Sequence, residues 1–108
     1  MLPGEPHRLL VAVTGASGML YLRTFLRVIA DSGVEVHGIC SPSGRQVLRM
    51  EEGIEPAALP GITRWFAPDD FAAPPASGSS RYHGMVVLPC SMGTLAAIAS
   101  GLSVNLIH

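Results

Sequence analysis

The feature that most constrains the fold is a short apolar run that stops at a glycine-rich turn. Residues 8–14 read Arg-Leu-Leu-Val-Ala-Val-Thr without polar alternation, which is typical of a strand buried on both faces of a parallel sheet. Gly15-Ala16-Ser17-Gly18 follows. Beyond it, one apolar stripe has helical spacing: Leu22, Phe25, Leu26 and Ile29. The sequence predicts a strand, a tight turn, and a helix from Met19 that Ser32-Gly33 ends with a glycine at its C′ position.

The same succession of strand, turn and helix recurs twice. Residues 34–40 are expected to form the second strand, a turn lies at 41–43, and a helix is expected from about Gly44 to Glu51. Residues 84–89 return to the buried-strand pattern, followed by a turn at 90–94 and a helix from Leu95. Between them, only 62–66 indicates a strand, and 67–80 is a proline- and alanine-rich connection. Right-handed crossovers of this kind predict a parallel α/β sheet.

Composition excludes several classes of function. A chain of 108 residues suits one domain, and 48% apolar residues can form a core without disulfides. The net charge of −1 gives no footprint for nucleic acid. All seven basic residues are arginines, so a P-loop, which needs a lysine, is excluded. We see no signal peptide and no transmembrane span. The lone Cys40 and Cys90 favour a cytoplasmic protein, and the scattered histidines predict no metal site.

The three turns are the candidate functional region. Ligands of open parallel sheets bind beyond the carboxyl ends of the strands, where helix N-termini offer N–H groups to phosphate. The alternative is structural: the glycines only permit a tight turn, while Ser17, Ser41 and Thr94 are helix caps. Cys40 and Cys90 are expected to be packing residues, and Glu51 is a solvated helix end in this interpretation. The G-x-G-x-x-G spacing is absent, which disfavours an ordinary dinucleotide site.

Taken together, four blocks resemble the flavin prenyltransferases of the UbiX/Pad family. The first is the 13–18 motif followed by Tyr21, and the second is Ser41 with Glu51 ten residues later. The third is the 73–80 connection. The most specific is the 85–95 segment, Met-Val-Val-Leu-Pro-Cys-Ser-Met-Gly-Thr-Leu, followed by 97–99, Gly101 and Asn105-Leu106. The resemblance covers about residues 8–107.

This resemblance implies a Rossmann-like (flavodoxin-type), three-layer parallel sheet, of which the chain is the N-terminal part. It implies metal-independent transfer of a dimethylallyl group from dimethylallyl phosphate to N5 of reduced FMN, with ring closure at C6. It also implies a homo-oligomer and a partner decarboxylase, as in ubiquinone synthesis, that uses the prenylated FMN. The cofactor-binding residues carried over from the family are Gly15, Ala16, Ser17, Ser41, Ser91, Met92, Gly93 and Thr94. Glu51 matches the glutamate that handles the proton.

The chain departs from the family in length. Family members run to roughly twice 108 residues, and the arginine that contacts phosphate would follow His108. We therefore expect residues 1–108 to be a single flavoprotein domain that is incomplete at the C-terminus, a truncated product whose catalysis is open. One alternative is a non-catalytic FMN-binding fragment or oligomer subunit. Another is an FMN-dependent cysteine-type decarboxylase, although the catalytic histidine of those relatives is not found near the first helix.

Overall fold

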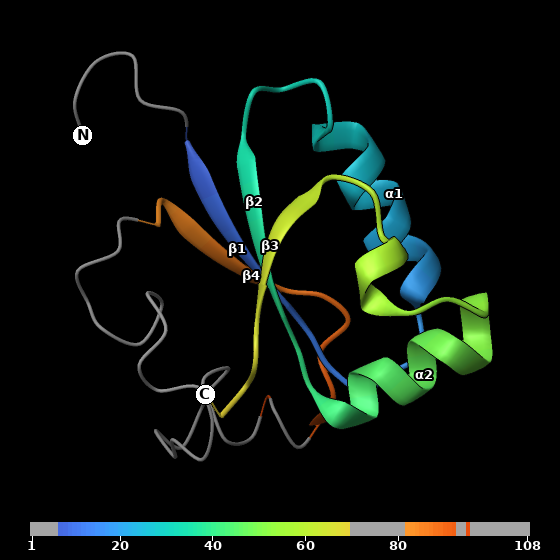
Figure 1. The fold of residues 1–108 in the computed structure, drawn as a ribbon. Coiled ribbons are helices and arrows are strands. Elements are labelled where there is room, and N and C mark those ends of the chain that lie inside the picture. The colour runs from blue at the N-terminus through green and yellow to red at the C-terminus, as the bar shows by residue number, and fades with distance from the viewer. Residues whose placement is uncertain (1–6, 70–81, 93–94, 96–108) are drawn as a thin grey trace.

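The computed structural model describes residues 7–69, 82–92 and 95. Four parallel strands form one sheet in the order β3-β2-β1-β4 (Figure 1). The elements along the chain are β1 (Arg8–Val13), α1 (Met19–Ile29), β2 (Glu35–Cys40), α2 (Pro42–Glu52), the 3-10 turn η1 (Pro56–Ala58), β3 (Ile62–Phe66) and β4 (Gly84–Val87). The predicted parallel α/β fold is confirmed.

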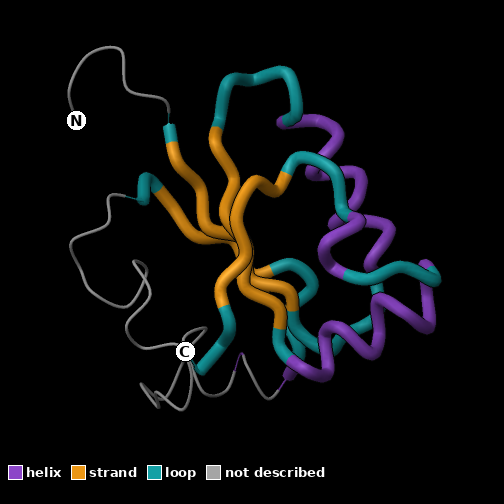
Figure 2. The backbone as a smooth tube through the Cα atoms, in the orientation of Figure 1, coloured by secondary structure: helices purple, strands orange, loops and turns teal. Residues whose placement is uncertain are grey.

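The strand order reverses at β1. The chain runs outward from β1 through β2 to β3, and then returns so that β4 pairs with the other side of β1. Both α1 and α2 lie against the same face of the sheet (Figure 2). The third layer of the predicted sandwich falls outside the described residues. The carboxyl ends of β1 and β4 thus form the crevice at which open α/β sheets bind ligands.

The core has two parts, because successive residues of β1 point to opposite faces of the sheet. Val11 and Val13 pack under the helices with buried residues of both helices, and Leu10 and Ala12 pack on the opposite face. Burial of each large apolar side chain contributes about 1.5–3 kcal/mol. The members under the helices are Val11, Val13, Met19, Leu22, Leu26, Val36, Leu48 and Leu59; those opposite are Leu10, Ala12, Ile39 and Phe66. This confirms the two-sided burial predicted for residues 8–14.

Helix boundaries differ from the sequence prediction in detail. α1 ends at Ile29, so Gly33 is not its C′ residue; with a φ of 81° it instead belongs to the turn that leads into β2. α2 begins at Pro42, whose fixed φ suits the first helical position. It continues to Glu52 and ends at Gly53 with a φ of 67°. The two expected helices at 19–29 and 42–52 are therefore confirmed with shifted ends, and the helix expected from Leu95 lies, beyond Leu95 itself, outside the described residues.

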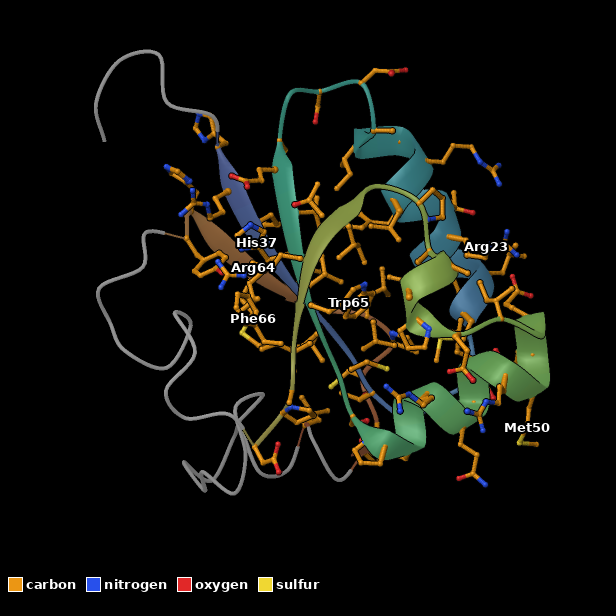
Figure 3. All side chains as sticks on the ribbon, viewed as in Figure 1. Arg23, His37, Met50, Arg64, Trp65 and Phe66 are labelled. Carbon is orange, nitrogen blue, oxygen red and sulfur yellow. The ribbon has the colours of Figure 1, made fainter. Side chains whose placement is uncertain are left out.

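β3 carries an irregularity that decides which way its side chains point. Val36 pairs with Ile62 but His37 pairs with Arg64, so one extra residue is inserted between them. As a result Trp65 packs under the helices, whereas Phe66 lies on the opposite face (Figure 3). Such a bulge reverses the inside–outside alternation of a strand.

Candidate functional site

Thr14 joins the first turn to the third. It follows β1 directly and is 1% exposed. Its hydroxyl donates to the carbonyl of Pro89 at 2.6 Å and accepts from the backbone N–H of Ser91 at 2.7 Å. Thr14 lies within the 13–18 motif of the sequence, but it is not among the predicted site residues. The available signal was a hydroxyl residue set between a buried strand and a glycine.

The first turn lies against the start of α2 at a distance that only glycine permits. A Cβ on Gly15 would lie 2.6 Å from Cβ and Oγ of Ser43, and a Cβ on Gly44 would lie 2.6 Å from the carbonyl oxygen of Val13. The backbone N–H of Ser41 donates to that same carbonyl at 2.9 Å. Glycine at both positions thus lets the first two turns share one surface, as the predicted site requires.

Ser41 is the N-cap of α2. Its Oγ accepts the backbone N–H of Gly44 at 3.0 Å and lies 3.2 Å from Oγ of Ser43. The structural reading of Ser41 as a cap is therefore correct. It does not exclude ligand contact, because a capping hydroxyl still carries a proton that it can donate.

Glu51 reaches from the end of α2 to the start of α1. Its Oε1 accepts the backbone N–H groups of Gly18 and Met19, each at 3.1 Å. The bond from Met19, and next to it the bond from Gly18, hold the pKa of the Glu51 carboxyl below its usual value. The Ser17 side chain lowers this pKa by a smaller amount. Glu51 is thus a carboxylate at neutral pH and a weak base. It is exposed, yet it is not the merely solvated helix end of the structural alternative.

This contact corrects one expectation about the first turn. The N-terminus of α1 was expected to offer unpaired N–H groups to a phosphate. Gly18, the N-cap residue of α1, has no side chain that could cap the helix. Instead, Glu51 accepts the N–H groups of both Gly18 and Met19. A carboxylate at a helix N-terminus is stabilised by the helix dipole. A phosphate must therefore displace Glu51 or bind elsewhere on the rim.

The third turn is described only in part. The N–H of Ser91 is held by Thr14, and the N–H of Leu95 donates to the carbonyl of Ser91 at 2.9 Å, which indicates one helical turn. The side chain of Met92 is 80% exposed. Gly93 and Thr94 lie outside the described residues. The structure therefore brings Gly15, Ala16, Ser17, Ser41, Glu51 and Ser91 to one edge of the sheet, and their ligand contacts stay a prediction.

The cysteines and the buried histidine have packing roles in the structure. Burial raises the pKa of the Cys40 thiol to about 11, so it is protonated at neutral pH. His37 is 6% exposed and lies on the sheet face opposite the helices. Its ring nitrogens contact the Tyr82 hydroxyl at 2.7 Å and Glu35 at 3.1 Å. Among the described residues, no three histidine, cysteine or acidic side chains are grouped as metal ligands would be.

Comparison with known proteins identifies the family. The family model described as Flavoprotein matches residues 3–108. The chain belongs to the Flavoprotein family. Within it, the sequence is similar to the flavin prenyltransferases UbiX of Methanocaldococcus jannaschii, with 42% identity over 93% of this chain, and of Deinococcus radiodurans, with 42% identity over 97%. The aligned region is 54% of each relative, so the chain spans about half the length of the curated relatives it matches.

Solved structures of similar proteins share the fold. The crystal structure of AnUbiX in complex with FMN and dimethylallyl pyrophosphate matches with a TM-score of 0.88 and 36% identity, over 95% of this flavoprotein chain and 55% of that one. A dodecameric FMN-dependent UbiX-like decarboxylase from Escherichia coli O157:H7 matches with a TM-score of 0.85 and 32% identity, over 93% and 56%. In the part of this chain that the structure describes, no helix has the length and apolarity to cross a membrane.

Proposed function

We propose that the rim formed by the three turns holds reduced FMN, and that the protein transfers a dimethylallyl group from dimethylallyl phosphate to N5 of that flavin. The observation that carries the proposal is the joining of the three turns in a fold that matches AnUbiX bound to FMN and dimethylallyl pyrophosphate: Thr14 links the first turn to the third, and the bond from Ser41 N–H to the Val13 carbonyl links the first to the second. The catalytic proposal rests on relatives about twice as long, and the flavin proposal rests on the residues of this chain.

The rim fits a flavin because its residues are small and its polar groups converge. Gly15 and Gly44 bring the backbone of the first turn against α2, because neither position has room for a Cβ. Hydroxyl groups of Ser17, Ser41 and Ser43 stand along it. Preorganised donors of this kind are suited to the phosphate and the carbonyl oxygens of FMN.

The residues of the chain have separate tasks in this proposal. Reduced FMN would supply the nucleophilic N5, which bonds to the dimethylallyl carbon as the bond from that carbon to the phosphate oxygen breaks. Ser41 donates to the flavin, and Gly15, Ala16 and Ser17 contact the flavin or the prenyl phosphate. Ser91, Met92, Gly93 and Thr94 line the ring. Glu51, ionised and beside the first turn, is placed to accept the proton that N5 loses.

Incubation with reduced FMN and a dimethylallyl donor under anaerobic conditions tests the proposal. Mass analysis of the released flavin should show the added dimethylallyl group with dimethylallyl phosphate, and a parallel reaction with the pyrophosphate determines which donor is used. FMN binding should be measured on the same sample. Binding without any mass change would contradict the transferase and favour the non-catalytic FMN-binding alternative. Neither binding nor transfer would contradict both.

The assembly and the recipient of the product are part of the same proposal. We propose that the protein is a homo-oligomer, supported by the dodecameric relative and by apolar side chains exposed on α1: Leu20, Tyr21 and Val28. A decarboxylase that uses prenylated FMN, as in ubiquinone synthesis, is the proposed recipient. A cysteine-type decarboxylase, which acts on a cysteine of its substrate, is a weaker candidate, because such enzymes need a catalytic histidine near the first helix and His37 lies on the sheet face away from α1.

A further inference from the structure

A pocket of about 540 Å³ opens beside β2 and the edge strand β3, on the side of the sheet away from β4. It lies at the carboxyl ends of β2 and β3 and is bounded by the start of α2 and by η1. Its lining includes Ser41, Pro42, Arg45, Glu55, Pro56 and Trp65. This volume is within the usual range for sites that bind small molecules, roughly 300–1,000 Å³.

The strand order places this pocket where dinucleotide-binding folds hold adenosine. The order β3-β2-β1-β4 matches the first four strands of the doubly wound dinucleotide folds. In those folds the residue at the end of the second strand binds the ribose of the adenosine half, and an arginine nearby accommodates a 2′-phosphate. Ser41 follows β2 directly here and Arg45 lies one turn into α2. Ser41 stands where those folds carry an acidic residue, and Glu55, the carboxylate that lines this pocket, is paired with Arg49.

The aromatic wall of the pocket is built into the sheet. A Cβ on Gly38 would lie 2.6 Å from Cζ3 of Trp65, so the indole lies directly on the backbone of β2. The bulge in β3 is what turns Trp65 to this side (Figure 3). Pro42 and Pro56 add rigid apolar surface. A flat ring can stack on such a wall without disturbing the core, since stacking contributes about 0.5–1.5 kcal/mol beyond burial.

Charge at the mouth is positive on balance. Glu55 pairs with Arg49 at 2.6 Å and more loosely with Arg45, whose Nε lies 3.7 Å from its Oε2. One carboxylate thus faces two guanidinium groups. Arg45 has a side chain 60% exposed and can turn toward an anion in the pocket.

We propose that this pocket binds a 2′-phosphorylated adenosine, with the base on Trp65, the ribose at Ser41 and the phosphate at Arg45. The missing G-x-G-x-x-G spacing does not oppose this, because those glycines serve the pyrophosphate at the first turn. In this chain Glu51 occupies the N-terminus of α1 instead. The ligand is therefore either a free phosphoadenosine or the adenosine end of a larger nucleotide. The site shares Ser41 with the proposed flavin rim, and because one hydroxyl proton serves one ligand at a time, the nucleotide binds here to the flavin-free chain.

Trp65, the single tryptophan of the sequence, reports on the pocket directly. Titration of the full chain with adenosine 2′,5′-bisphosphate should quench its fluorescence to saturation, and adenosine should bind at least about tenfold more weakly because it lacks the charge partner of Arg45. Arg45→Ala should weaken the bisphosphate about tenfold without changing adenosine, and Arg45→Lys should retain most of the affinity. The control Arg27→Ala, on the exposed side of α1, should leave both unchanged.

Titrations with NADPH and with FMN distinguish the source of the nucleotide and separate this pocket from the flavin rim. NADPH that binds as tightly as the bisphosphate indicates the adenosine end of a dinucleotide, whereas bisphosphate binding with NADPH excluded indicates a free nucleotide. Loss of FMN binding with bisphosphate binding intact would contradict the proposed flavin function alone. Absence of saturable quenching, equal affinity for adenosine and the bisphosphate, or equal effects of Arg45→Ala and Arg27→Ala would each overturn the pocket assignment.

Discussion

At the scale of single residues, Thr14 is the link on which the site geometry depends. Thr14→Val keeps the shape of the side chain but removes the hydroxyl that donates to the carbonyl of Pro89 and accepts the N–H of Ser91, so these two bonds between the turns are lost. We expect a loss of about 1–3 kcal/mol in the free energy of unfolding, measured by chemical denaturation, and weaker FMN binding. Thr24→Val, an exposed position on α1, is the matched control. Equal stability of the two variants would contradict the assigned role.

Glu51 predicts a pH-dependent contribution to stability. Its carboxyl has a pKa lowered below the ordinary value of 4.5 by the N–H groups of Met19 and Gly18. Its stabilisation is therefore complete above about pH 4.5 and is lost as the pH falls through the lower, folded-state pKa. Thermal melts of Glu51→Gln should show a lower Tm than wild type at neutral pH, and the two should converge in acid.

The control for that series is Asp31→Asn, which removes an exposed carboxylate beyond the end of α1. It should follow the wild-type Tm at every pH. A Glu51→Gln deficit that stays constant from neutral pH into strong acid would show that the charge of Glu51 is not what holds the turn.

The sequence located Gly15, Ser17, Ser41 and Glu51 but not Thr14, and it did not predict the contact that Glu51 makes, for a physical reason. Gly15, Ser17 and Ser41 were predicted because a turn after a buried strand has a local signature. The contact of Glu51 with Gly18 joins residues 33 positions apart. It depends on the packing of α2 against α1, which no local pattern encodes.

At the scale of elements, Gly38 and Trp65 fix how β2, β3 and α2 pack together. Gly38→Ala would push a Cβ to 2.6 Å from the indole. We expect a loss of about 1–3 kcal/mol from overpacking, measured by urea denaturation, with altered Trp65 fluorescence. Gly84→Ala on β4, where the nearest atom is a Leu9 methyl at 3.4 Å, should change stability little. Similar losses in both variants would refute the close packing of Trp65 on β2.

The types of the elements could be predicted because hydrophobic periodicity is visible in short stretches of sequence. The ends of the elements, and the face of the sheet to which each side chain points, could not. The bulge between Ile62 and Arg64 could not be read from five residues without their pairing partners. It nevertheless decides that Trp65 rather than Phe66 faces the helices. The early end of α1 at Ile29 likewise reflects the turn that Gly33 makes into β2.

At the scale of the whole molecule, the exposed side of α1 is the feature that bears on assembly. Leu20 and Val28 are 63% and 74% exposed and lie two turns apart on one side of the helix. If the proposed homo-oligomer uses this surface, Val28→Glu should shift sedimentation toward smaller species. Met50→Glu, equally exposed on α2, should not. An unchanged distribution for Val28→Glu would exclude α1 from the interface.

The measurement that tests the central claim most directly is an equilibrium titration of the full chain with reduced FMN. The account predicts saturable binding of one FMN per chain, weakened at least about tenfold, or about 1.4 kcal/mol, in Gly15→Val, because a side chain there meets Ser43 and separates the first two turns. Gly84→Ala should bind as wild type does. No saturable binding by the wild-type chain, or equal affinity in Gly15→Val, would contradict the placement of the flavin on these turns.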